Sequence, residues 1–290
     1  MKVLLTGGTG YIGSKVLERL RGAGHDVVAV VRSDASAASV EAAGATSLLH
    51  DLTDVAWLTE QLATVDGAIH AAAPSDAPAA EFDDAVLAAV VAAFGDTGKH
   101  YVHTGGIWSY GSSDDVTEES PNNPPALTAW RHEREQRILT APVHASVVVP
   151  TIVYGHGSGI PALIVNAPRT ETGAITAVGT GEQHWPTVHV DDLADLYLAV
   201  LEHGTAGATY IGASGDNPTV AELAQAVVGD DVEVVAEGED ASRERLGAAF
   251  ADALFLDQQV HRVRATEELG WKPSGVGIVE DLASGSYRAS

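Results

Sequence analysis

The chain has 290 residues, of which 45% are hydrophobic, and its formal net charge at pH 7 is -24. This acidity disfavours nucleic acid and anionic membranes as partners, because both carry negative charge. No run of about 18 apolar residues occurs, and no charged-then-apolar leader precedes the first predicted strand, so we expect a cytoplasmic protein without a membrane span. Without cysteine the chain has no disulfide, no thiolate metal ligand and no cysteine nucleophile, and we predict no metal site.

The first thirteen residues predict a strand, a glycine-rich turn and a helix in direct succession. An apolar run at 3–5 ends at glycines spaced three residues apart, and residues 14–21 follow as a helix with one apolar face. Glycines let the backbone approach a pyrophosphate closely, and the helix N-terminus offers free N–H groups. An ordinary strand-to-helix turn is the alternative. The turn is predicted to bind a dinucleotide through Gly7, Thr9, Gly10, Tyr11, Ile12 and Gly13.

After this turn, strand-like runs alternate with helical stretches. We expect strands at 26–31, 45–49, 66–70, 100–104 and 145–149, and helices at 35–43, 54–62, 81–94 and 125–139. This alternation predicts a doubly wound parallel sheet with helices on both faces, which is a Rossmann-like α/β fold.

Beyond Pro150 the alternation loosens, with expected loops at 154–159 and 173–181 and a short strand at 233–235. Helices are expected at 189–203 and 219–228, the second opened by a capping box of Thr219 and Glu222. We therefore expect a core of residues 1–153, with 184–204 packing back on it. A small interleaved C-terminal substrate lobe is expected from 154–183 and 205–290.

Three segments carry a resemblance to a known superfamily. They are the G-x-x-G-x-x-G turn at 7–13, the segment PTVHVDDL at 186–193 and the segment ATEELGWKP at 265–273. In this order they resemble the extended and atypical branches of the short-chain dehydrogenase/reductases, over nearly the whole chain. The resemblance implies a nicotinamide cofactor and a small-molecule substrate.

The second strand ends at Val31, Arg32 and Ser33, where NAD-selective members of such folds carry an acidic residue. A guanidinium and a hydroxyl suit the 2′-phosphate of NADP(H), so we predict NADP(H) as the cofactor. Arg32 as a solvated surface residue is the alternative, and Asp34 is expected to cap the next helix.

The resemblance adds further residues to the expected cofactor site. Asp51 is implied to accept from the adenine amino group, and His70, just before the alanines, is read as either structural or functional. The added set comprises Asp51, Leu52, Ala71, Ala72, Ala73, Thr104, Pro150, Thr151 and Ile152.

The catalytic tyrosine and lysine that the resemblance implies are both missing from the helix expected at 125–139, and the superfamily's serine falls on Gly106. The remaining candidates for the chemistry are Thr104, Ser109, Tyr110 and Tyr154. Two pairs on that helix keep a spacing of four residues, Trp130 with Arg134 and Arg131 with Glu135. Solvated ion pairs are the simpler interpretation of these charges. Histidine is the residue type suited to proton transfer near neutral pH, so His132 is the candidate for that role on this helix.

The substrate side is predicted from Gly106, Trp108, Trp130, Tyr154, His184 and Trp185. Related sugar-nucleotide enzymes carry a phosphate-binding arginine where this chain has Gln183, His184 and Trp185, so a nucleotide sugar is not expected. Tryptophans facing a cleft would favour a flat, largely apolar ligand, although they could equally pack the lobe against the core.

We therefore predict an atypical NADP(H)-dependent oxidoreductase that reduces a C=O or C=N bond of an uncharged small molecule. A non-redox biosynthetic enzyme (isomerase, cyclase or epimerase) and a non-catalytic NADP-sensing protein are the alternatives. A homodimer, paired through the helices before the fifth and sixth strands, is also possible on this resemblance.

Overall fold

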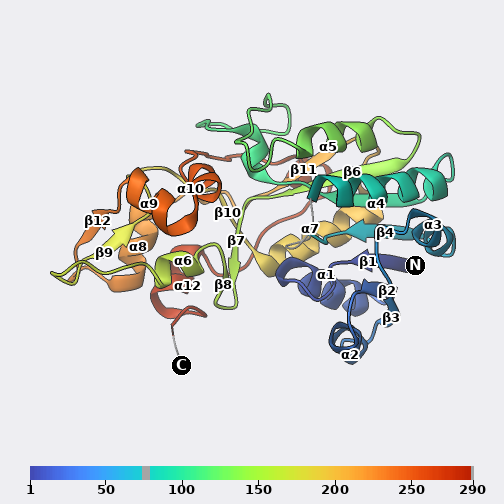
Figure 1. Cartoon of the computed structure of the whole chain (residues 1–290), viewed down its shortest axis with the longest axis horizontal. Helices are drawn as coiled ribbons and strands as arrows, with labels where there is room; N and C mark the ends of the chain where they lie inside the picture. Colours follow the sequence, from blue (N-terminus) through green and yellow to red (C-terminus); the bar gives the residue numbers. More distant parts are fainter. Residues whose placement is uncertain (74–78, 289–290) are drawn as a thin grey trace.

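The computed structural model describes residues 1–73 and 79–288, and a seven-stranded sheet lies at its centre (Figure 1). Its strands run in the order β11-β6-β5-β4-β1-β2-β3, and all their pairings are parallel. They are β1(Lys2–Thr6), β2(Asp26–Val31), β3(Thr46–Leu49), β4(Gly67–His70), β5(His100–Thr104), β6(His144–Pro150) and β11(Thr209–Gly212). The predicted Rossmann-like α/β fold is confirmed, and all six strands predicted for the core lie within one residue of the observed bounds.

Helices cover both faces of this sheet and bury two apolar clusters against it (Figure 1). One face carries α1(Tyr11–Gly22), α2(Asp34–Ala42) and α7(Val190–His203). The other carries α3(Val55–Ala63), α4(Ala79–Phe94) and α5(Arg131–Leu139). In helix α1 the helical spacing of apolar residues places Val16, Leu17 and Leu20 on one face, and this face is fully buried.

The order of the strands reverses between β1 and β4. From β1 the chain adds β2 and β3 toward one edge of the sheet, and from β4 it adds β5 and β6 toward the other edge. At such a switch point the connections leave the sheet on opposite faces, and a crevice opens at the carboxyl ends of the strands. The ligand site is therefore expected beside the ends of β1 and β4.

A smaller lobe lies beside the core and has an apolar cluster of its own (Figure 1). Its strands are β7(Ile152–Gly155), β8(Ser158–Gly159), β9(Ile175–Ala177), β10(Thr187–His189) and β12(Val234–Ala236). Its helices are α6(Ala162–Val165), α8(Val220–Val228), α9(Glu239–Leu246), α10(Ala248–Leu254) and α12(Ile278–Ser284). The short α11(Arg264–Glu268) instead packs beside β11, and Ala265 within it is buried in the core cluster. None of the described helices is long and apolar enough to cross a membrane.

Several local expectations change. Residues 126–130 form successive turns instead of a helix, so α5 begins only at Arg131. Residues 154–159, expected as a loop, are the antiparallel hairpin of β7 and β8. The strand β11 joins the central sheet beside β6, so residues 209–212 belong to the core and not to the lobe. The capping box of Thr219 and Glu222 is confirmed.

One buried carboxylate on α7 anchors the returning C-terminal segment to the core. The oxygens of Asp192 accept hydrogen bonds from the backbone N–H groups of Ser274 and Gly275, both at 2.9 Å. The indole N–H of Trp271 donates to the Asp192 carbonyl, also at 2.9 Å.

Asp192→Ala is expected to lower the free energy of unfolding by about 3 kcal/mol, because two partly buried N–H groups lose their acceptor. Urea denaturation measures this change. Asp191→Ala is the matched control, since this neighbour is far more exposed and its charge pairs with His156 and Lys15 at the surface. Equal losses in the two variants would show that Asp192 has no special anchoring role.

Candidate functional site

The glycine turn packs backbone against backbone at the end of β1. Gly7 has a φ of 77°, and a Cβ there would lie 2.5 Å from the carbonyl oxygen of Ala71. A Cβ on Gly13 would lie 2.1 Å from the carbonyl oxygen of Gly7, which also accepts a hydrogen bond from the Gly10 N–H at 2.9 Å. Side chains are excluded at both positions, so the first turn of α1 lies directly against the loop.

A cavity of about 250 Å³ opens over this turn, at the carboxyl ends of β1, β2 and β4. It is lined by Gly7, Thr9, Gly10, Val30, Val31, Arg32, Ser36, Leu52, Ala71, Ala72, Ala73 and Phe82. The structure thus brings together eight of the residues predicted for the cofactor. No side chain caps α1, so the N–H groups of its first turn are open to an anionic ligand. The cavity has the features that a dinucleotide requires.

Other residues predicted for the cofactor hold the surrounding structure and do not line this cavity. The hydroxyl of Tyr11 donates to the carbonyl oxygen of Gly155 at 2.9 Å, and Ile12 packs on the core. Ser33, and not Asp34, caps α2 by accepting from the Ser36 N–H at 3.2 Å. Ser36 takes its place as the hydroxyl in the cavity wall.

Asp51 and the segment after β6 are also engaged elsewhere. The Asp51 carboxylate accepts from the Thr53 N–H at 2.9 Å, and this hydrogen bond lowers the pKa of Asp51. Pro150 ends β6, and the Thr151 hydroxyl donates to the carbonyl oxygen of Gly212 at 2.7 Å. Ile152 is buried in the lobe cluster. None of these four residues lines the cavity.

A second, smaller cavity of about 40 Å³ lies on the β4–β5 side of the switch point and shares the three alanines with the first. It is lined by His70, Ala71, Ala72, Ala73, Ala79, Asp83, Thr104, Trp130 and Arg131. Thr104 is fixed there, because its hydroxyl donates to the carbonyl oxygen of His70 at 2.7 Å and lies 2.7 Å from the hydroxyl of Tyr197. Of the predicted residues, Thr104 and Trp130 therefore lie at this end.

Because α5 begins at Arg131, Arg131 faces the site and Arg134 does not. The Arg131 guanidinium lies over the Trp130 ring, 4.5 Å from its centroid, and donates to the Thr104 carbonyl oxygen at 3.4 Å. Arg134 turns instead toward α4, where it pairs with Asp84 at 2.6 Å. Arg131 is a site residue that sequence reasoning only placed among several equivalent charges.

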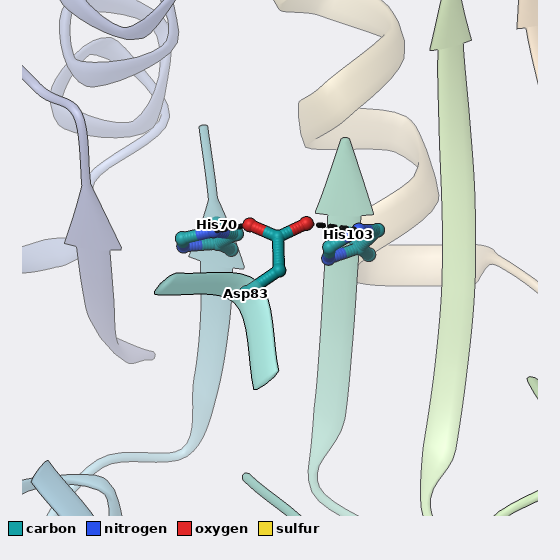
Figure 2. Close-up of side chains that lie close together, drawn as sticks. All are labelled: His70, Asp83 and His103. Carbon is teal, nitrogen blue, oxygen red and sulfur yellow. Dashed lines mark hydrogen bonds and ion pairs between the residues drawn. The ribbon is translucent and has the colours of Figure 1, made fainter. Parts of the chain in front are cut away.

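A buried carboxylate bridges two imidazoles beside this cavity (Figure 2). Asp83 lies 3.2 Å from Nε2 of His70 and 3.6 Å from Nε2 of His103. The other ring nitrogens contact the Thr6 hydroxyl at 2.7 Å and the Tyr101 hydroxyl at 3.0 Å. His70 is therefore both structural and part of the cavity wall.

The charges in this network follow from burial and pairing. Burial opposes ionisation of Asp83, but the hydrogen bond and electrostatic attraction of His70, together with the charge of Arg131, outweigh it and lower the pKa of Asp83. Burial lowers the pKa of His103 to about 3, so this imidazole is neutral at pH 7. Its Nδ1 faces the Tyr101 hydroxyl, and its Nε2 faces the Asp83 carboxylate.

Sequence reasoning missed this network. Its one signal was that His70 and His103 end two neighbouring strands, where the register pairs them directly. The ligand atoms of His70, Asp83 and His103 lie within 4.8 Å of one another and could hold a divalent cation, as could the more exposed set of His156, His189 and Asp191. In the buried set, each of these atoms already has a partner.

Glu135 is the second buried carboxyl near the end of β5. It is 8% exposed, and its Oε1 has no hydrogen-bond partner among the described residues. A Cβ on Gly105 would lie only 2.8 Å from that oxygen, so the carboxyl occupies the space beside the strand. Burial raises the pKa of Glu135 to about 7, against the opposing charge of Arg131.

The two phenols predicted for proton transfer lie elsewhere. Tyr110, in the 3-10 turn η1(Ile107–Tyr110), is 8% exposed and packs in the core cluster, and burial raises its pKa. The hydroxyl of Tyr154 donates to the carbonyl oxygen of Val276 at 2.8 Å, and burial raises its pKa as well. Ser109 is buried next to Tyr110. None of the three lines either cavity at the switch point.

The aromatic wall predicted for the substrate is mostly packing. Trp185 is 2% exposed, and its indole N–H donates to the Leu254 carbonyl oxygen at 3.0 Å within the lobe. Trp108 contacts Phe250 edge to face at 5.9 Å, which joins core and lobe. His184 pairs with Asp257 at 2.9 Å, and the space beside Gly106 is open. Only Trp130 of this set lines a cavity at the switch point.

Fold and site together define a dinucleotide-binding α/β protein. Residues 3–212 match the NAD dependent epimerase/dehydratase family, and the chain belongs to this family of the extended short-chain dehydrogenase/reductases. It is 29% identical over 298 residues to an uncharacterised protein of Schizosaccharomyces pombe, covering 99% of this chain and 100% of that protein.

Two further comparisons are informative. A 4-hydroxy-2-methyl-3-oxo-4-farnesyl-3,4-dihydroquinoline-1-oxide ketoreductase of Stigmatella aurantiaca is 34% identical over 232 residues, which cover 74% of this chain and 69% of that one. A crystal structure of a dTDP-glucose 4,6-dehydratase from Streptomyces venezuelae with NAD bound has a TM-score of 0.76 at 23% identity, and covers 98% of this chain and 95% of that one. The second comparison confirms the fold.

Glu135→Gln is expected to remove a pH-dependent loss of stability. A carboxyl whose pKa is higher in the folded protein favours folding below its unfolded pKa of 4.5, and this contribution disappears as the pH rises through about 7. The variant should therefore gain about 3 kcal/mol relative to the wild type between pH 4.5 and pH 8.5.

Urea denaturation across this pH range measures the difference, with Glu133→Gln on the exposed side of the same helix as the control. If the two variants run parallel to the wild type at every pH, Glu135 does not titrate in the way that its burial requires.

Proposed function

We propose that this protein is an NADP(H)-dependent reductase of a C=O or C=N bond in an uncharged small molecule. The observation that carries the proposal is the pair of cavities that meet at Ala71–Ala73. The larger has an open helix N-terminus for phosphates and Arg32 in its wall. The smaller has fixed polar groups and room for little more than the reacting atoms of a substrate.

The wall of the larger cavity supports NADP(H) over NAD(H). Arg32 and Ser36 supply a guanidinium and a hydroxyl, and none of the described residues lining the cavity is acidic. A 2′-phosphate is bound well by such groups, whereas the ribose 2′-hydroxyl of NAD is usually held by a carboxylate. The dehydratase from Streptomyces venezuelae contains NAD, so the cofactor preference proposed here rests on this chain's own residues.

When bound, a reduced nicotinamide supplies a hydride to the carbonyl or imine carbon, the bond's electron pair moves to the oxygen or nitrogen, and a proton from water completes the product. The protein's part is to hold and shield these reactants. The N–H groups of the glycine turn bind the diphosphate, and Thr104 holds the end of β5 in place through its two hydrogen bonds. Water is the simpler proton source, because Tyr110 and Tyr154 do not line the two cavities.

The substrate side supports an uncharged ligand. Among the described residues that line the small cavity, Arg131 and the carboxylate of Asp83 carry opposite charges. The similarity to the ketoreductase of Stigmatella aurantiaca supports the hypothesis that the substrate of this protein is a carbonyl compound. Of the tryptophans expected to favour a flat ligand, Trp185 is buried inside the lobe and Trp130 lines the small cavity.

Titration of the purified protein with NADPH and NADH, followed by nicotinamide fluorescence, tests the cofactor. We expect NADPH to bind at least tenfold more tightly, and Arg32→Ala to remove most of that preference by taking away a charged hydrogen bond. Gly13→Ala should weaken both cofactors, because its Cβ would displace Gly7.

A panel of ketones, aldehydes and cyclic imines then tests the reaction through NADPH absorbance. Binding of NADPH without oxidation by any of them would favour a non-redox enzyme or a binding protein. Binding of neither cofactor would contradict the proposal altogether.

A further inference from the structure

Among the described residues that line the small cavity, Arg131 is the one permanent cation, and most of its N–H donors have no partner in that part of the chain. A guanidinium has five N–H donors, and here one of them makes a long hydrogen bond of 3.4 Å to the Thr104 carbonyl oxygen. Within the described part of the chain Arg131 forms no ion pair, whereas Arg134 and Arg137 on the same helix both pair with Asp84 at 2.6 Å. Donors are therefore available at the cavity wall.

The position of Arg131 is fixed by its neighbours. Its guanidinium lies over the ring of Trp130, 4.5 Å from the centroid, and Trp130 lines the same cavity. The Thr104 carbonyl oxygen holds one nitrogen, and Thr104 is itself held by His70 and Tyr197. A cation held in this way can stabilise charge that develops on a bound atom without reorganising.

The surroundings of Arg131 select a neutral ligand. Asp83 lies in the same cavity wall with its carboxylate fixed between His70 and His103 (Figure 2), so a ligand carboxylate would meet a like charge. A neutral carbonyl group offers an oxygen that accepts from the guanidinium and carries no charge of its own. A volume of about 40 Å³ exceeds the roughly 10–15 Å³ that a cavity needs to hold one water molecule, so it suits such a small terminal group.

We propose that Arg131 binds the oxygen of a neutral carbonyl substrate and stabilises the negative charge that this oxygen gains during reduction. This inference rests on the proposed reductase function and adds the residue that carries its chemistry. Arg131 keeps its proton, so it acts as a hydrogen-bond donor and the proton of the alcohol comes from water. The cavity wall that it shares with Ala71–Ala73 places it beside the cofactor cavity.

The test measures ketone binding and turnover separately. Two probes, 4-chromanone and methyl 3-oxohexanoate, are titrated calorimetrically into wild type, Arg131→Gln and Arg131→Lys, each with and without saturating NADP⁺, which cannot reduce them. Arg137→Gln is the matched control, because Arg137 is an exposed arginine of the same helix that pairs with Asp84 and lines neither cavity. Thermal unfolding shows that each variant is folded.

We expect wild type to bind at least one ketone in the presence of NADP⁺, and Arg131→Gln to weaken that binding about tenfold or more with NADP⁺ affinity unchanged. Turnover of that ketone with NADPH should fall about 10²–10³-fold in Arg131→Gln, as for loss of other oxyanion donors. Arg131→Lys should retain part of both, and Arg137→Gln should match the wild type. In Arg131→Gly, added guanidinium ion should restore part of the turnover.

Unchanged ketone binding in Arg131→Gln, or no binding of either ketone to wild type, would overturn the assignment. The proposed function fails in a different way. If ketone binding depends on Arg131 but NADPH is not consumed, Arg131 binds carbonyl oxygens in a protein that is not a reductase. If NADPH is consumed equally by wild type and Arg131→Gln, the reductase stands without Arg131.

Discussion

The contact between the Gly7 carbonyl oxygen and the first turn of α1 is the constraint on which the rest of the site depends. Because no side chain separates Gly13 from Gly7, the helix N-terminus lies directly over the end of β1. Gly7 in turn lies against the backbone of Ala71, so β1, α1 and the segment after β4 meet through main chain alone. The two cavities open on either side of this contact and share its alanines. Close backbone packing thus sets where phosphates and reacting atoms can lie.

Buried charged groups determine the electrostatics of the part of the site near the end of β5. Two carboxyls of this strongly acidic chain, Asp83 and Glu135, lie within the electrostatic influence of the Arg131 guanidinium at the end of β5. Asp83 stays ionised because two imidazoles flank it, while Glu135, which lacks a hydrogen-bond partner in the described structure, holds its proton up to about pH 7. The glycine at position 105 belongs to this arrangement, since any larger residue would displace the Glu135 carboxyl. The glycine after β5 and the buried Glu135 carboxyl therefore depend on each other, because the carboxyl occupies the space that a side chain at position 105 would need.

The sequence predicts the part of this protein that depends on local chemistry. Glycine spacing, the apolar runs and Arg32 after β2 identify the fold and most of the larger cavity, because each effect acts within a few residues. The side-chain roles at the reacting end depend on tertiary packing. Trp185 and Tyr154 are residue types that often line binding sites, but both are buried inside the lobe. No local sequence pattern reveals this burial. The bridge from His70 through Asp83 to His103 requires the strand register and the placement of α4, and the choice between Arg131 and Arg134 requires knowing where α5 begins.

The lobe's interleaving with the core has a consequence for how such enzymes diversify. Its buried residues come from three separate stretches, 152–185, 220–254 and 278–287, and the chain between them returns to the core clusters. A single crossover before residue 152 would therefore exchange the whole lobe only together with α7, β11 and α11 of the core, and a later crossover would divide the apolar cluster of the lobe. Because lobe and core segments alternate along the chain, a change that replaces the lobe also replaces parts of the core.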